Sequence, residues 1–199
     1  MSDHYFSPAP HSAEKRQLVG ATVWGHSLRL ESASGVFSAG RLDTGTAVLL
    51  REAPPPTGAG TLLDLGCGYG VIACALAVQA QEAHVWAVDT NDRARRLCGD
   101  NAVTAGVTAR VHVAEPDGVP PEMCFDEIWS NPPIRIGKPA LHDLLLRWLP
   151  RLTPNGRALL VVGKNLGADS LQRWLDDQAF PCARLASAKG FRVLQVVRS

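Results

Sequence analysis

The stretch from residue 61 to 80, TLLDLGCGYGVIACALAVQA, constrains the fold of this chain more than any other. Residues 61–65 form a short apolar run that predicts a buried strand, and the apolar run from residue 71 is typical of a helix. Between them, three glycines at alternating positions permit a tight turn and let a ligand approach the backbone closely. A strand that passes through a glycine loop into a helix predicts an α/β fold.

Strands and helices alternate along the rest of the chain. We predict further strands at 84–89, 109–113, 126–130 and 157–163, with helical patterns at 91–105, 141–149 and 166–175. This alternation predicts a parallel sheet with helices on both faces. Two last strands, at 181–187 and 191–197, are joined by a short Lys189–Gly190 turn, so they must be antiparallel. We therefore expect a seven-stranded, mostly parallel sheet that ends in an antiparallel C-terminal hairpin.

The N-terminal part has a different pattern. Residues 21–32 alternate around Gly25 and predict a small β-hairpin, and residues 34–50 run from a glycine-rich loop into a short helical pattern. The stretch APPPTGAG at 53–60 predicts a boundary. We expect residues 1–60 to form an extension packed on the core and residues 61–199 to form the main domain, since 199 residues suit one well-packed core.

The composition of the chain limits where the protein can be located and which partners its charge can attract. The five cysteines are scattered and lack any C-x-x-C spacing, so we expect no metal site, no disulfide framework and a cytoplasmic protein. No apolar window approaches the ~18 residues of a membrane span, and the N-terminus has no signal-peptide pattern. The net charge of +1 gives no attraction of the whole protein for nucleic acid. A nucleic-acid partner would therefore need a local basic patch.

Two carboxylates accompany the glycine loop. The loop reads D-x-G-x-G-x-G, which differs from the G-x-G-x-x-G of nicotinamide-binding loops and disfavours an oxidoreductase. Asp64, just before the glycines, suits a cationic amine, and Asp89, at the end of the next strand, is placed to accept hydrogen bonds from a ribose diol. S-adenosyl-L-methionine has both groups. The alternative is a tight turn in which Asp64 caps a helix.

LLDLGCGYG, VWAVD and the later SNPP resemble the class I S-adenosylmethionine-dependent methyltransferases over residues 61–199. The resemblance implies a Rossmann-like fold and S-adenosyl-L-methionine as cofactor. Family members usually hold the adenine amine with an acidic or polar residue after the third central strand; Glu115 is our choice, Asp117 the rival, and a solvated loop acid the alternative. The implied cofactor-binding residues are Asp64, Gly66, Cys67, Gly68, Gly70, Asp89, Glu115 and Asn131.

Asn131-Pro132-Pro133 follows the fourth strand, and in this superfamily that position of N-P-P is typical of enzymes that methylate planar nitrogens. An amine conjugated to a ring is a poor nucleophile. The side-chain oxygen of Asn131 and the carbonyl oxygen of Pro132 can accept its hydrogen bonds and aim its lone pair at the methyl group. Proline rigidity holds these acceptors still. We predict Asn131 and Pro132 as catalytic residues; the alternative is a Pro-Pro turn with an asparagine cap.

SNPPIRIGKPALHDLL, SGVFSAGRLDTGTAVLL and HYFSPAP resemble the small-subunit ribosomal-RNA guanine-N2 methyltransferases and their short single-domain relatives, from about residue 4 to 199. The longer bacterial members carry an additional N-terminal methyltransferase-like domain that this chain lacks. The resemblance implies ribosomal RNA, or the small ribosomal subunit, as partner. Open alternatives are a protein glutamine-N5 methyltransferase, a small-molecule N-methyltransferase and a catalytically idle cofactor-binding module.

Many N-P-P enzymes continue with an aromatic residue that stacks on the target base, and here that position is Ile134. Phe37 can supply the missing ring, or it anchors the N-terminal segment in the core. Asp43 either lies near the cofactor or caps a helix. Arg41 and Lys138 either contact phosphates or are solvated. The predicted substrate-binding residues are Pro133, Ile134, Phe37 and Arg135.

Overall fold

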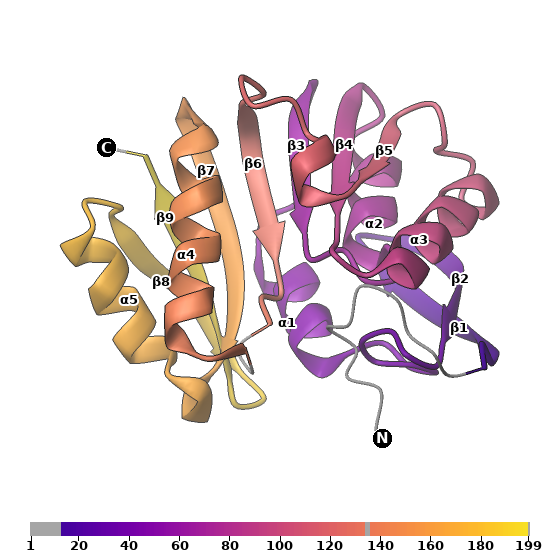
Figure 1. Cartoon of the computed structure of the whole chain (residues 1–199), viewed down its shortest axis with the longest axis horizontal. Coiled ribbons are helices and arrows are strands. Elements are labelled where there is room, and N and C mark those ends of the chain that lie inside the picture. Colours follow the sequence, from indigo (N-terminus) through magenta and orange to yellow (C-terminus); the bar gives the residue numbers. More distant parts are fainter. Residues whose placement is uncertain (1–12, 134–135, 199) are drawn as a thin grey trace.

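The computed structural model describes residues 13–133 and 136–198 of the chain. Its main sheet has seven strands in the order β5-β4-β3-β6-β7-β9-β8 (Figure 1). Neighbours among the five strands β3 to β7 pair in parallel, and β9 pairs antiparallel with β7 and β8. This confirms the predicted Rossmann-like α/β fold with its C-terminal hairpin. The strands are β3 (Gly60–Leu65), β4 (Ala83–Val88), β5 (Val111–Ala114), β6 (Phe125–Ser130), β7 (Leu152–Gly163), β8 (Cys182–Ala188) and β9 (Phe191–Val197).

Helices cover both faces of the sheet. On one face lie α1 (Thr44–Glu52), α2 (Val71–Gln79) and α3 (Asp92–Thr104), and on the other lie α4 (Lys138–Trp148) and α5 (Ala168–Asp177). Short 3-10 turns are η1 (Pro116–Gly118), η3 (Leu149–Arg151) and η4 (Lys164–Leu166). Alternate residues along a strand enter the two cores, since Leu62 packs in the first and Leu63 in the second. This explains why a central strand such as β3 has buried residues on both of its faces.

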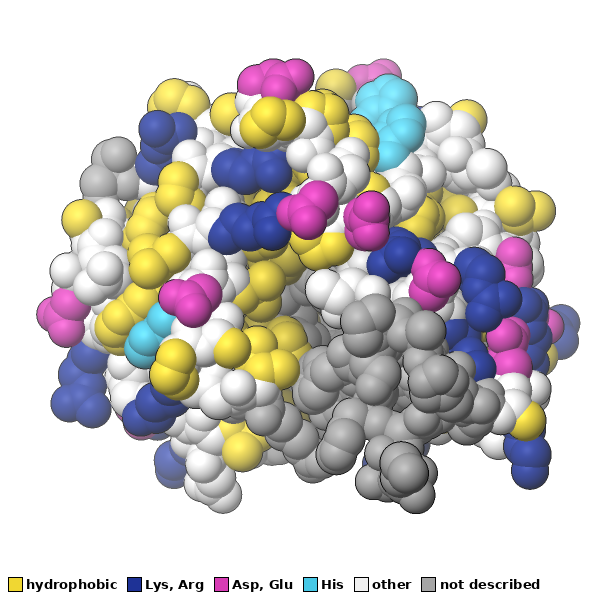
Figure 2. Space-filling view, viewed as in Figure 1, with side chains coloured by type: hydrophobic (Ala, Val, Ile, Leu, Met, Phe, Trp, Pro, Cys, Tyr) yellow, Lys and Arg dark blue, Asp and Glu magenta, His cyan; other side chains and the backbone are white. Residues whose placement is uncertain are grey.

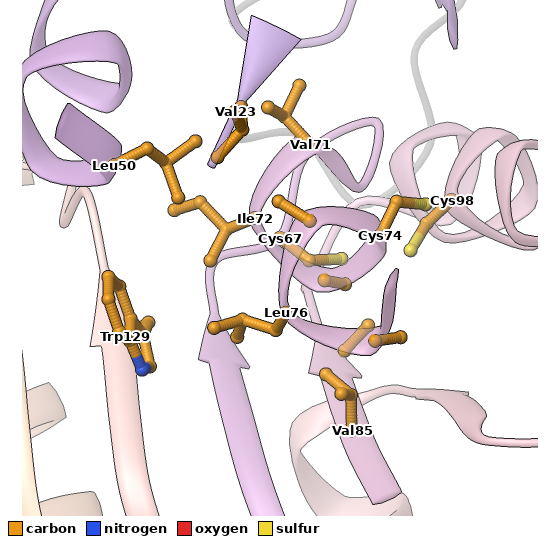
Figure 3. Packing of buried hydrophobic residues seen from close by; sticks show 14 of the residues in the cluster. Val23, Leu50, Cys67, Val71, Ile72, Cys74, Leu76, Val85, Cys98 and Trp129 are labelled. Carbon is orange, nitrogen blue, oxygen red and sulfur yellow. The ribbon is translucent and has the colours of Figure 1, made fainter. Parts of the chain in front are cut away.

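The first core also contains a two-stranded hairpin of β1 (Arg16–Val23) and β2 (His26–Ala33). This confirms the predicted hairpin, which is longer than the 21–32 expected. Val23 pairs with His26, and Trp24 and Gly25 between them have φ of 48° and 85°, as a tight two-residue hairpin turn requires. The hairpin covers α2, whose residues are buried nearly all round (Figure 3). The domain boundary at residue 60 stays a prediction.

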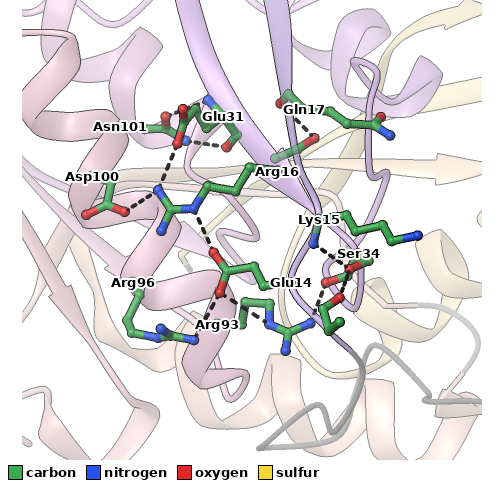
Figure 4. A network of polar contacts seen from close by, with 12 residues as sticks. Glu14, Lys15, Arg16, Gln17, Glu31, Ser34, Arg93, Arg96, Asp100 and Asn101 are labelled. Carbon is green, nitrogen blue, oxygen red and sulfur yellow. Dashed lines mark hydrogen bonds and ion pairs between the residues drawn. The ribbon is translucent and has the colours of Figure 1, made fainter.

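Polar contacts join the hairpin to α3 (Figure 4). Arg16 pairs with Glu14, Glu31 and Asp100, but these exposed ion pairs contribute little. Asn101, which is 1% exposed, contributes more. Its amide nitrogen donates to the carbonyls of Glu31 (2.8 Å) and Tyr69 (2.7 Å), and its oxygen accepts from the Glu31 N–H (2.7 Å). One buried side chain therefore ties the hairpin, the glycine loop and α3 together.

Two smaller features complete the fold. β7 begins at Leu152, five residues before the predicted strand, because Leu152 already pairs with Phe125 of β6. Across the described ranges, no helix has both the length and the apolar character needed to cross a membrane.

Candidate active site

A cavity of about 470 Å³ opens at the carboxyl ends of the parallel strands. The chain turns back at this point: β4 and β5 lie on one side of β3, and β6 and β7 on the other. Ligands of open α/β sheets bind at such a switch point. The predicted site residues that line the cavity are Phe37, Gly66, Gly68, Asp89, Asn131, Pro132 and Pro133. Ile134 and Arg135 fall outside the described residues.

The three glycines of the loop have different roles, two at the cavity and one in helix packing. Gly66 and Gly68 line the cavity, with φ of 78° and 54°, and a Cβ on either would meet nothing within 4 Å. A ligand can therefore approach this backbone closely. A Cβ on Gly70 would lie 2.6 Å from the Sγ of Cys98, so Gly70 lets α2 pack on α3. Cys67 is buried and lines a small adjoining pocket with Gly66 and Gly68.

Asp89 follows β4 and lines the cavity. Its two carboxylate oxygens accept hydrogen bonds from the backbone N–H groups of Gly68 (2.9 Å) and Asn91 (2.8 Å). These bonds fix the carboxylate against the glycine loop, and each oxygen keeps a lone pair for a further donor. Burial raises the pKa of Asp89, and the backbone N–H donors oppose this effect. The arrangement suits a diol that donates two hydrogen bonds.

Asp64 is fully buried and does not line the cavity. One oxygen accepts from the Ala73 N–H in the first turn of α2 (2.9 Å), and the other has no hydrogen-bond partner among the described residues. Burial raises the pKa of Asp64 to about 8. The Asp64 side chain thus accepts a backbone hydrogen bond in the first turn of α2, as the helix-capping alternative predicts. A role for Asp64 opposite the cofactor's amine stays a prediction.

The amide of Asn131 has a fixed orientation. Its nitrogen donates to Oδ1 of Asp43 (2.7 Å) and to Oγ1 of Thr46 (3.1 Å). Because an ionised carboxylate only accepts hydrogen bonds, the NH₂ group must face Asp43. The amide oxygen is then left for other donors. Asp43 caps α1 by accepting from the Thr46 N–H (3.0 Å), which is the capping role weighed from the sequence. Asp43 also lines the cavity, and its position near the cofactor stays a prediction.

The segment that carries Phe37 lies beside the amino end of α3. Asn91 caps α3 and donates its side-chain nitrogen to the Gly35 carbonyl (3.0 Å), and Arg93 donates to the Ser34 carbonyl (2.7 Å). Phe37 itself is 38% exposed and lines the cavity. Its position favours contact with a ligand over the role of a core anchor.

The two acids after β5 lie away from the cavity. Glu115 is exposed and does not line it, although the next residue, Pro116, does. Asp117 is 86% exposed at its side chain and pairs with Arg147 (2.7 Å). An adenine contact by either residue therefore stays a prediction without geometric support.

Sequence reasoning missed several residues that shape the cavity. Asn91 carries a recognisable local signal, because an asparagine before a helical run is a typical cap. Leu144, Leu166 and Phe191 have no such signal, because only the fold brings α4, η4 and β9 to the same opening. Arg41 lines the cavity and Lys138 does not.

Comparison with known proteins points to one family. The family model of the methyltransferase small domain matches residues 27–195. An uncharacterised protein of Bacillus subtilis, YbxB, is 30% identical over 98% of both chains. The ribosomal RNA small subunit methyltransferase C of Pseudomonas aeruginosa is 34% identical over 86% of this chain. This chain spans about half the length of that relative, 52%.

Among solved structures, the 16S rRNA N2 G1207 methyltransferase of T. thermophilus, in complex with AdoMet and guanosine, superposes with a TM-score of 0.81 and 23% identity. The superposition covers 96% of this chain and 52% of that one. A ribosomal protein L11 methylase of Lactobacillus delbrueckii gives a TM-score of 0.62 and 20% identity, covering 80% of this chain and 84% of that one. At these identities the two structures support the fold.

Proposed function

The chain belongs to the methyltransferase small domain family, and on this premise we propose that it methylates guanine N2 in small-subunit ribosomal RNA. Its cofactor is S-adenosyl-L-methionine, in common with the class I methyltransferases whose fold it has. The RNA assignment draws on the names of the relatives, which include a small-subunit ribosomal RNA methyltransferase and a 16S rRNA N2 enzyme. The observation that carries the proposal is the fixed amide of Asn131 at the cavity.

The glycine-loop side of the cavity fits the cofactor. Gly66 and Gly68 leave open space over their backbone, and Asp89 presents a carboxylate held by two backbone N–H groups. Asp89 would hold the ribose hydroxyls, while the loop backbone would lie along the ribose and the methionine part. When bound, the cofactor supplies an electrophilic methyl group on a sulfonium.

On the other side of the cavity, Asn131 and Pro132 would orient the acceptor. The amide oxygen of Asn131, left available by the bonds to Asp43 and Thr46, accepts one hydrogen bond from the exocyclic amine. The Pro132 carbonyl accepts the other. Both acceptors favour the positive charge that develops on the nitrogen in the transition state. As the new carbon–nitrogen bond forms, the carbon–sulfur bond breaks and releases a neutral thioether. The methylated nitrogen, which is then positively charged and strongly acidic, would lose its proton to water, so no strong general base is needed.

Tritium transfer tests this function. The purified protein is incubated with methyl-labelled cofactor and with separate RNA, protein and metabolite fractions, and labelled RNA is digested to nucleosides. We expect label in RNA as N2-methylguanosine. Asn131→Ala should lower kcat about 100- to 1000-fold, as the loss of one transition-state hydrogen bond does elsewhere, with an unchanged Kd for S-adenosylhomocysteine. Label in protein alone would refute the RNA assignment and favour an amide acceptor.

A further inference from the structure

One wall of the cavity comes from two segments that the mechanism above does not use, η4 and the turn between β8 and β9. Leu166 of η4 and Gly163, the residue just before η4 at the end of β7, line the cavity, and so does Phe191, which follows the turn at the start of β9. The N–H of Lys164 donates to the Gly190 carbonyl (2.8 Å), which holds the two segments together. We call these residues, 163–166 and 189–191, the hairpin wall.

The turn is built to hold Phe191 in place. Lys189 and Gly190 have φ of 48° and 81°, the two positive values of a tight two-residue hairpin turn. Phe191 then pairs with Gly163 of β7, which has no side chain to cover the ring from the opposite strand. Instead, Leu166 fills the space beside Gly163, where a Cβ would lie 3.0 Å from its Cδ1. The wall is therefore a ring and an aliphatic side chain on a rigid backbone.

Phe191 also lies close to the proposed catalytic amide. A Cβ on Gly45 would be 3.0 Å from Cε1 of Phe191 and 3.3 Å from Nδ2 of Asn131. The ring edge and the amide thus both lie against the same point of the α1 backbone. A planar group whose amine reached the oxygen of Asn131 would have this ring within range. A stacking ring is what the N-P-P sequence lacks at Ile134.

Two of the chain's four lysines, Lys164 and Lys189, belong to the hairpin wall. Both are exposed, and neither takes part in an ion pair between residues that the structure describes. Asp169, at the start of α5, is already paired with Arg192 and Arg184. On the face shown in Figure 2, acidic side chains are interspersed among many of the basic ones. The hairpin wall therefore combines an aromatic ring with positive charge that no described acidic residue neutralises, a combination typical of proteins that bind single-stranded nucleic acid.

We propose that the hairpin wall is the surface that binds the acceptor nucleotide: Phe191 stacks on the target base, and Lys164 and Lys189 contact the phosphates beside it. This proposal deepens the proposed function and rests on it. It assigns the stacking role to a residue 57 positions after the one that holds it in related N-P-P enzymes. It also gives a chain of net charge +1 a local basic contact for RNA.

The test uses the full chain and the RNA that the wild-type protein labels. Phe191→Ala should raise KM for RNA about 10- to 100-fold, the range expected for one lost base–aromatic stack, with an unchanged Kd for S-adenosylhomocysteine. Phe191→Trp should keep KM within a few-fold of wild type, because it keeps a stacking face. The unchanged cofactor affinity reports that Phe191→Ala is folded.

The lysines are tested by the salt dependence of RNA binding. Lys164→Gln and Lys189→Gln should each weaken binding and lower the slope of log K against log salt by about 1. Arg29→Gln, an exposed position on β2 that does not line the cavity, removes the same charge and should leave the slope unchanged.

The outcomes separate the two proposals. If the wild-type protein labels no RNA, the proposed function is wrong and the inference falls with it. If the wild-type protein labels RNA while Phe191→Ala keeps its KM, the hairpin wall does not bind the base. Equal salt slopes for the lysine variants and for Arg29→Gln would overturn the phosphate contacts.

Discussion

Replacement of Asp43 by alanine tests whether this carboxylate orients the amide of Asn131, the proposed catalytic group. The wild-type carboxylate oxygen accepts from Nδ2 of Asn131 (2.7 Å) and from the Thr46 N–H that begins α1 (3.0 Å). A hydrogen bond to a charged group is worth about 1.5–3 kcal/mol, and a helix cap about 1 kcal/mol. Without Asp43, the amide keeps only the Thr46 hydroxyl, which can donate as well as accept and so no longer selects its orientation.

We therefore expect Asp43→Ala to lower kcat by about 10- to 150-fold, the upper bound set by the lost charged hydrogen bond. The free energy of unfolding should fall by about 1–2 kcal/mol, chiefly from the lost cap. Steady-state kinetics on labelled RNA give kcat, urea unfolding gives the stability, and calorimetry gives the Kd for S-adenosylhomocysteine. That Kd should stay unchanged.

Asp43→Asn is the matched control. Its side-chain oxygen can still accept from both the Thr46 N–H and Asn131, and asparagine caps helices as well as aspartate does. Only the charge is lost, so kcat should fall by no more than about fivefold. The reasoning would be refuted if both variants kept kcat and bound S-adenosylhomocysteine more weakly. In that case the charge of Asp43 serves the cofactor's amine.

Two further predictions concern packing and pH. A Cβ on Gly45 would lie 3.0 Å from both Oδ1 of Asp43 and Cε1 of Phe191. Gly45→Ala should therefore lower the free energy of unfolding by about 1–3 kcal/mol and should also lower kcat. A melting temperature and a kcat equal to those of the wild type would show that the site can relax. Burial raises the pKa of Asp64 to about 8, so between about pH 4 and 8 the folded state holds a proton that the unfolded state has lost. Wild-type stability should therefore fall relative to Asp64→Asn as the pH rises, by up to about 1.4 kcal/mol per pH unit, in urea titrations at pH 5 and pH 8. Parallel stability curves for the two proteins would contradict a protonated Asp64.

The sheet was predictable because its signals are local. Each strand is a short apolar run bounded by glycine, proline or polar residues, and the Lys189–Gly190 turn leaves only an antiparallel pairing. The same holds for the residues that follow strand ends. Gly66, Asp89 and Asn131 all line the cavity, because parallel strands bring their carboxyl ends to one edge.

Contacts between distant segments were not predictable. Asp43 and Asn131 are 88 residues apart, and nothing in either neighbourhood indicates that the carboxylate and the amide meet. Phe191 begins the last strand and reaches the cavity only because β9 inserts between β7 and β8. The prediction of Glu115 as the adenine contact depends only on its distance along the chain from the end of a strand. The chain turns into η1 there, and Pro116 lines the cavity instead.

The position of Asn131 follows from how the sheet divides the cavity. On the β3–β4 side, the lining includes the glycine backbone and the polar groups of Asp89 and Asn91, which suit a nucleoside with a charged amino-acid end. On the β7–β9 side, it consists of apolar side chains such as Leu166 and Phe191, which suits a flat base. β6 lies between these two sides in the strand order, so a residue at its carboxyl end adjoins both. Under the proposed function, β6 is therefore the parallel strand whose carboxyl end would place an acceptor amine next to a methyl donor bound on the β3–β4 side.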